Sequence, residues 1–182
     1  MVSDSLLPPA APDFDEPMEM LLACHERLQA RLDTLLRLAA WLPEHGADRA
    51  AQQAAANVMR YFDSAAVNHH LDEERDLLPA LEVRAVGKLA DEVHALREWV
   101  ESDHRRIGTA WSVLRGSLAG IAAGSATTLP EEAMASFVDA YRRHVEREEG
   151  ELFPLAEILL RAEDLSAMSA TMSARRRQRM AD

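Results

Sequence analysis

The chain has 182 residues and a formal net charge of −11 at pH 7, a length that fits one domain with a sizeable core. Its 32 alanines and 24 leucines far outnumber its 18 valines, isoleucines and threonines, which favours helix over strand. The acidic balance argues against a nucleic-acid or anionic-membrane partner. The single cysteine excludes an internal disulfide and a cysteine-rich metal site.

The first residues lack the basic start and the apolar run of a signal peptide. No stretch reaches the roughly 18 uncharged apolar residues that a membrane span needs. We therefore expect a cytoplasmic protein in a reducing compartment, with neither nucleic acid nor membrane among its partners.

Proline and helical spacing divide the chain into a tail, a bundle and an extension. Residues 1–16 contain three prolines and are expected to form a flexible tail. A three-and-four spacing of apolar residues then predicts four long helices, and the short loops between them favour an all-α, up-down-up-down antiparallel four-helix bundle over residues 17–161. Residues 162–182 are expected to form a short C-terminal helix with a basic tail. The four helices are predicted at 17–42, 48–81, 86–119 and 130–161.

The second and fourth predicted helices contain an internal repeat. Shifting the sequence by 75 residues places 59–82 on 134–157 with nine of 24 positions identical. The repeat aligns His69 with His144 and Glu73 with Glu148. A His-x-x-x-Glu spacing puts both side chains on one helix face, one turn apart. Each of these two helices therefore presents two candidate ligands together.

These side chains continue the apolar stripes of their helices, so the glutamates point into the predicted core. A buried carboxylate without a partner costs on the order of several kcal/mol, so two of them indicate a bound cation. The other two helices each add one inward histidine at a similar level along the bundle. Imidazoles and carboxylates without thiolates suit iron or manganese, and carboxylates can bridge two ions. The six predicted metal ligands are His25, His69, Glu73, His104, His144 and Glu148.

The motifs around these residues resemble the hemerythrin-like, HHE cation-binding domain family. The resemblance covers about residues 17–161 and implies the hemerythrin four-helix bundle. It also implies a non-haem di-iron centre, bridged by Glu73, Glu148 and a solvent oxygen, that binds O₂ or related small molecules such as NO and peroxide. Manganese or zinc are the expected substitutes for iron. The motifs are "CHERL" with His25, "HHLDEERDLLP" with His69 and Glu73, "DHRRI" with His104, and "HVEREEGELFP" with His144 and Glu148.

The sequence departs from the oxygen-carrying members of that family on the third helix. Those members have two histidines four residues apart there, whereas the positions four before and after His104 are Val100 and Gly108. Glu101 lies three residues before His104 and is the first candidate to fill the missing position. His70 and Glu74 are further candidates.

One more residue is expected to contact a bound molecule. Tyr141 lies one turn before His144 on the same face, where its hydroxyl either hydrogen-bonds a ligand or packs in the core.

Three functions remain open at this stage. The missing histidine favours sensing, NO or peroxide chemistry, or iron and oxygen handling over simple O₂ storage, and the sequence leaves enzymatic turnover undecided. A ferritin-like carboxylate oxidase needs two Glu-x-x-His motifs, of which only Glu101 with His104 fits. A metal-stabilised structural or regulatory bundle without turnover is the other alternative. Association into a homodimer is also left open.

Overall fold

The structure is a computed structural model that describes residues 16–181, and every regular element in this range is helical. The predicted all-α class is therefore confirmed for the described part of the chain. Apart from Glu16, the predicted tail lies outside the described residues. None of the described helices is both long and apolar enough to cross a membrane. The elements are α1 (Pro17–His45), α2 (Arg49–Phe62), α3 (Ala65–Asp72), η1 (Glu73–Leu77), α4 (Leu78–Arg84), α5 (Lys88–Ala122), α6 (Glu131–Arg147), η2 (Glu148–Leu152), α7 (Phe153–Leu159) and α8 (Ala162–Ala181).

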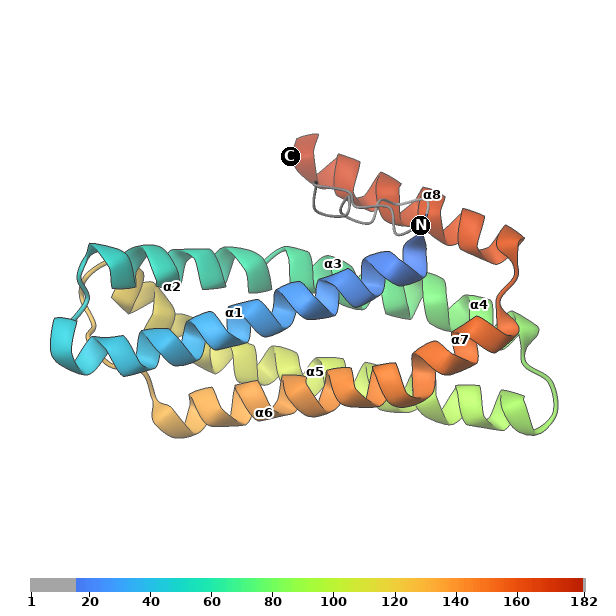
Figure 1. Cartoon of the computed structure of the whole chain (residues 1–182), viewed down its shortest axis with the longest axis horizontal. Coiled ribbons are helices and arrows are strands. Elements are labelled where there is room, and N and C mark those ends of the chain that lie inside the picture. Colours follow the sequence, from blue (N-terminus) through green and yellow to red (C-terminus); the bar gives the residue numbers. More distant parts are fainter. Residues whose placement is uncertain (1–15, 182) are drawn as a thin grey trace, which may run out of the picture.

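Four rods lie side by side along the long axis of the molecule (Figure 1). They are α1, the interrupted rod from α2 to α4, α5, and the rod from α6 to α7, and consecutive rods run in opposite directions. Both α1 and α5 pack against α2 and α6. The arrangement leaves one shared interior that all four rods line.

The apolar core is split into two clusters, one towards each end of the rods. One cluster lies towards the connections that follow α1 and α5, and it includes Leu35, Val58, Phe62, Leu118 and Phe137. The other lies towards the opposite end, and it includes Leu21, Leu81, Val93, Leu152, Met168 and Met172. Met168 and Met172 belong to α8, so the C-terminal helix contributes to the core. Buried polar residues occupy the layer between the two clusters.

The basic segment of α8 is tied to the bundle. Arg175 and Arg176 both form ion pairs with the fully buried Asp72, the residue directly before Glu73. The expectation of a basic tail therefore needs refinement, because these two arginines hold α8 against the end of α3.

The predicted helix boundaries are close, with informative differences. The first helix continues three residues beyond its predicted end, through Pro43 to His45. Gly46, at φ 60°, then ends it. Asp48 accepts a hydrogen bond from the backbone N–H of Ala51 at 2.8 Å, so it caps the N-terminus of α2.

Both repeat segments contain a π-helical turn, which the sequence analysis did not predict. The turns are η1 and η2, and each begins at the glutamate of its His-x-x-x-Glu motif. In both, the backbone N–H five residues later donates to the carbonyl of that glutamate. Pro79 and Pro154 come next in the chain and lack the N–H that a regular α-helix requires. Such turns are frequent at functional sites, and here each one begins at a glutamate of the repeat.

Candidate metal centre

The six predicted ligands converge in the layer between the two apolar clusters. All six residues are buried, with at most 6% of their surface exposed. Their ligand atoms form two groups, each with all its atoms within 4.8 Å of one another. We call the first group, with His25 and His69, the first subsite, and the second group, with His104 and His144, the second subsite. Glu73 and Glu148 belong to both groups.

Each glutamate directs one carboxylate oxygen to each subsite. For Glu148, Oε2 lies 3.2 Å from Nε2 of His25, and Oε1 lies 3.0 Å from Nε2 of His144. For Glu73, Oε1 lies 3.2 Å from Nε2 of His69, and Oε2 lies 3.4 Å from Nε2 of His104. Each carboxylate therefore has one oxygen beside a histidine of the first subsite and one beside a histidine of the second.

The polar atoms of this layer are poorly paired with one another and are better suited to bind a cation. All four carboxylate oxygens of Glu73 and Glu148, together with Nε2 of His25 and of His69, are buried without a hydrogen-bond partner of acceptable geometry among the described residues. Nε2 of His104 and Nε2 of His144 face each other at 3.1 Å. Because unsatisfied buried polar atoms are costly, this donor set supports a metal centre. Its nitrogen and oxygen ligands suit iron or manganese.

Three of the four histidines are oriented by a carboxylate on the ring nitrogen that faces away from the centre. Glu149 lies 2.8 Å from Nδ1 of His25, and Glu74 lies 2.7 Å from Nδ1 of His104. Asp103 lies 3.1 Å from Nδ1 of His144. Such partners fix the tautomer of a ligand and raise its basicity. Glu74 is thus placed behind a ligand, not at the missing ligand position.

Sequence reasoning missed the role of Asp103. The residue directly precedes His104, but its carboxylate reaches across from α5 to His144 on α6. A contact between two helices leaves no periodic signal along one of them. The position of Asp103 beside a histidine was the only available hint.

Without a cation, the charges in this layer are balanced by protons. Burial and the facing carboxylate of Glu148 raise the pKa of Glu73 to about 7. Burial opposes the charged imidazolium, yet the neighbouring carboxylates raise the pKa of His104 to about 8 and that of His144 to about 10. Although burial favours neutral Glu148, the charge of His144 holds the pKa of that carboxyl well below its usual range. A cation entering the centre would replace these protons.

Glu101 is the one predicted contact that the structure does not bring to the centre. Its carboxylate accepts a hydrogen bond from Nε of Arg97 at 2.9 Å, and its side chain is 34% exposed. The i, i+4 pair keeps Glu101 on the outer face of α5. Tyr141, in contrast, is buried, and its hydroxyl lies 3.4 Å from Nε2 of His70.

A helical bundle with a buried layer of histidines and glutamates defines the class as a metal-binding helical protein. The comparisons narrow the class to a family. The model of the hemerythrin HHE cation-binding domain matches residues 16–156, and the chain belongs to this family. It is also 31% identical over 163 residues to an uncharacterized protein of Haemophilus influenzae, an alignment that covers 90% of this chain and 91% of that protein.

Proposed function

We propose that this protein holds a non-haem di-iron centre that binds O₂, NO or peroxide. The single observation that carries the proposal is the sharing of Glu73 and Glu148, each with one oxygen towards each subsite. The proposal treats the four rods as the up-down-up-down hemerythrin bundle. In this centre, two carboxylates and four imidazoles are available to two ions.

The chain supplies the surroundings in which such ions would work. Two bound iron ions would supply a pair of Lewis-acidic, redox-active positions for small oxidants. Glu73 and Glu148 would offset the positive charge of such ions, and the carboxylates behind the imidazoles keep the rings oriented. The apolar clusters above and below the layer exclude water, which strengthens electrostatic interactions in the centre.

The ligand count favours binding and reaction over storage alone. Each subsite has two histidines and two shared glutamates, which is fewer ligands than an octahedral ion takes. Both ions would therefore keep room for a small molecule. Sensing, detoxification, or handling of oxygen and iron are consistent with this openness.

Metal analysis combined with an anaerobic-to-aerobic absorption spectrum tests the proposal. We expect two irons per chain and a visible absorption change on adding O₂, azide or peroxide to the reduced or oxidised protein. Iron that raises the unfolding temperature without any such spectral change would support the structural bundle instead. A ferritin-like oxidase is disfavoured because Glu101 pairs with Arg97, so its Glu-x-x-His motif is not formed.

A further inference from the structure

The two subsites differ in the ring that covers one of their imidazoles. In the first subsite, Phe153 stacks on His25 with ring centroids 5.2 Å apart and an interplanar angle of 11°. In the second subsite, His70 stacks on His104 at 3.7 Å and 8°. The first cover is apolar, whereas the second carries hydrogen-bonding nitrogens. The second subsite is therefore the one equipped to contact a polar molecule.

The internal repeat shows that the polar cover belongs to one subsite only. Shifting by 75 residues aligns His70 with Val145 and Tyr141 with Ala66. Neither residue has a polar counterpart, whereas the ligands His69 and Glu73 do. Holding the ions is common to both halves of the repeat, so His70 and Tyr141 need a role beyond it.

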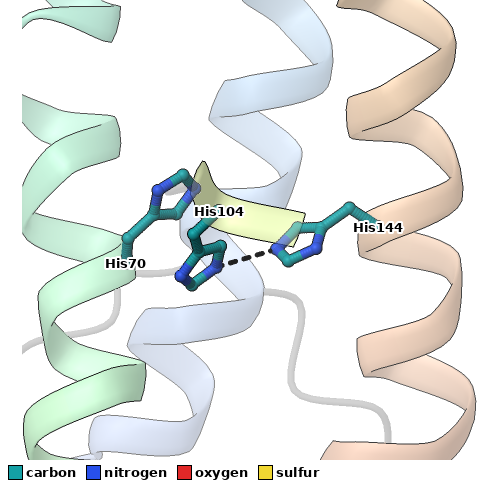
Figure 2. Close-up of side chains that lie close together, drawn as sticks. All are labelled: His70, His104 and His144. Atoms are coloured by element: carbon teal, nitrogen blue, oxygen red, sulfur yellow. Dashed lines mark hydrogen bonds between the residues drawn. The ribbon is translucent and has the colours of Figure 1, made fainter. Parts of the chain in front are cut away.

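Ring geometry places His70 beside the second subsite, outside its ligand set. One ring nitrogen of His70 lies within 4.8 Å of the ligand nitrogens of His104 and His144, and Figure 2 shows the three rings next to one another. However, the His70 and His104 rings are nearly parallel. Imidazole lone pairs lie in the plane of their ring, so the nitrogens of these two stacked rings point along parallel planes and not at one common point. This orientation suits a contact with a molecule bound to the ion.

Together, His70 and Tyr141 have one hydrogen-bond donor that their mutual contact does not use. The Tyr141 hydroxyl and Nε2 of His70 are 3.4 Å apart, and within residues 16–181 the structure gives neither side chain another hydrogen bond. If the hydroxyl donates to Nε2, the neutral ring keeps an N–H on Nδ1. If Nε2 donates to the hydroxyl, Tyr141 keeps its O–H. In either tautomer one donor remains for a third partner.

We propose that His70 and Tyr141 form a pair that hydrogen-bonds a small acceptor molecule at the second subsite. The class of ligand is a molecule of two or three heavy atoms with a lone pair or negative charge, for which azide is the probe. This inference rests on the proposed function, because it needs an ion held by His104 and His144. Beyond the proposed function, it specifies that the small molecule binds at the second subsite and that His70 and Tyr141 contact this molecule.

Azide titration of the iron-loaded, full-length protein tests the pair. The variants are His70→Ala, His70→Gln and Tyr141→Phe, and visible absorption gives the azide Kd while metal analysis gives iron per chain. We expect the iron content to stay at the wild-type level and the Kd to rise about 10-fold in His70→Ala and Tyr141→Phe, the effect of losing one charge-assisted hydrogen bond. His70→Gln retains an N–H donor and should recover part of the affinity.

A control makes the outcome specific. His94→Ala changes an exposed histidine and should leave the iron content and the azide Kd unchanged. Loss of iron in His70→Ala would overturn the proposal by making His70 a ligand, and an unchanged Kd in both His70→Ala and Tyr141→Phe would overturn it as well. If the wild-type protein itself binds no iron pair or gives no azide band, the proposed function fails, and this inference fails with it.

Discussion

The two subsites contain the same ligand types in different surroundings. Both have two histidines and share Glu73 and Glu148. In the first subsite, Nδ1 of His69 is buried without a hydrogen-bond partner among the described residues, and an apolar ring covers His25. In the second subsite, carboxylates hold Nδ1 of both histidines. Sharing two ligands does not make the two positions equivalent, and we expect the ions in them to differ in affinity and reactivity.

Protonation adds to this difference. Burial, together with the charge of His25, lowers the pKa of His69 well below its usual value, so this ligand is neutral before a cation arrives. In the second subsite the pKa of His104 is raised to about 8 and that of His144 to about 10. A cation must displace protons from both. In the first subsite only His25 has a raised pKa, because the opposing effect of burial is outweighed by Glu148 and Glu73. The second subsite, with two such histidines, is therefore the more sensitive of the two to acid.

The largest expected effect comes from the shared glutamates. Glu148→Gln or Glu73→Gln removes a charged ligand from both subsites, and we expect each variant to lose both irons and the stabilisation that the ions provide. Metal analysis and thermal unfolding with and without iron measure this. Glu151→Gln is the matched control, because Glu151 is exposed and pairs only with Arg147 in the described structure. Retention of one tightly bound ion in Glu148→Gln would show that the carboxylates do not bridge.

Single histidines should separate the subsites. We expect His69→Ala to lose the ion of the first subsite and His144→Ala to lose that of the second, so each variant keeps about one iron. Mössbauer spectra of the two variants should show different single environments. Each variant should also unfold at a lower temperature than the wild-type protein, because buried carboxylates lose part of their compensating charge. Wild-type iron content in both variants would contradict the assignment.

Acid should empty the second subsite first. Each displaced proton changes the apparent metal affinity about 10-fold per pH unit in the range where the free ligand is protonated. Between about pH 7 and 8, where Glu73 is largely ionised, two protonated histidines give about 100-fold per unit in the second subsite. In the first subsite His69 is already neutral, so the proton on His25 adds at most about 10-fold per unit. Below about pH 7 the proton on the shared Glu73 adds equally to both subsites. Affinity falls as pH falls in both. Competition with a colorimetric chelator across pH measures the two slopes, and equal slopes would remove this distinction.

The carboxylates behind the imidazoles should act on one subsite each. Asp103→Asn weakens the orientation of His144 and should reduce affinity in the second subsite about 10- to 100-fold. Glu149→Gln should do the same for His25 in the first subsite. The two variants are controls for each other, since each should leave the other ion in place. A chelator competition in which both ions weaken equally in either variant would contradict this prediction.

Helical periodicity and the internal repeat were enough to predict the six residues of the candidate metal centre. The spacing of His69 and Glu73, repeated at His144 and Glu148, placed charged side chains on apolar stripes, and helix levels predicted a shared layer. These are properties of single helices and are written into one stretch of sequence. The all-α class follows from the same periodicity.

The parts that sequence reasoning missed depend on contacts between helices or on irregular backbone. The π-helical turns shift the register after Glu73 and Glu148, although a regular helix was assumed. Asp103 reaches a histidine on another helix. Glu101 has the right spacing to join His104, but a closer partner one turn earlier, Arg97, binds it. Spacing identifies which face a side chain occupies and leaves open which partner it chooses there.

Glu101 gives the smallest expected effect and sharpens the comparison of the subsites. Glu101→Gln breaks the ion pair with Arg97, a partly exposed contact worth at most about 1 kcal/mol. Iron content and azide affinity should therefore stay at wild-type values, while the unfolding temperature changes little. Arg97→Ala frees Glu101 from its partner and is the companion variant. Loss of iron in Glu101→Gln would mean that Glu101 turns inward to bind the second ion, and the open position proposed for a small molecule beside His104 would then belong to the protein itself.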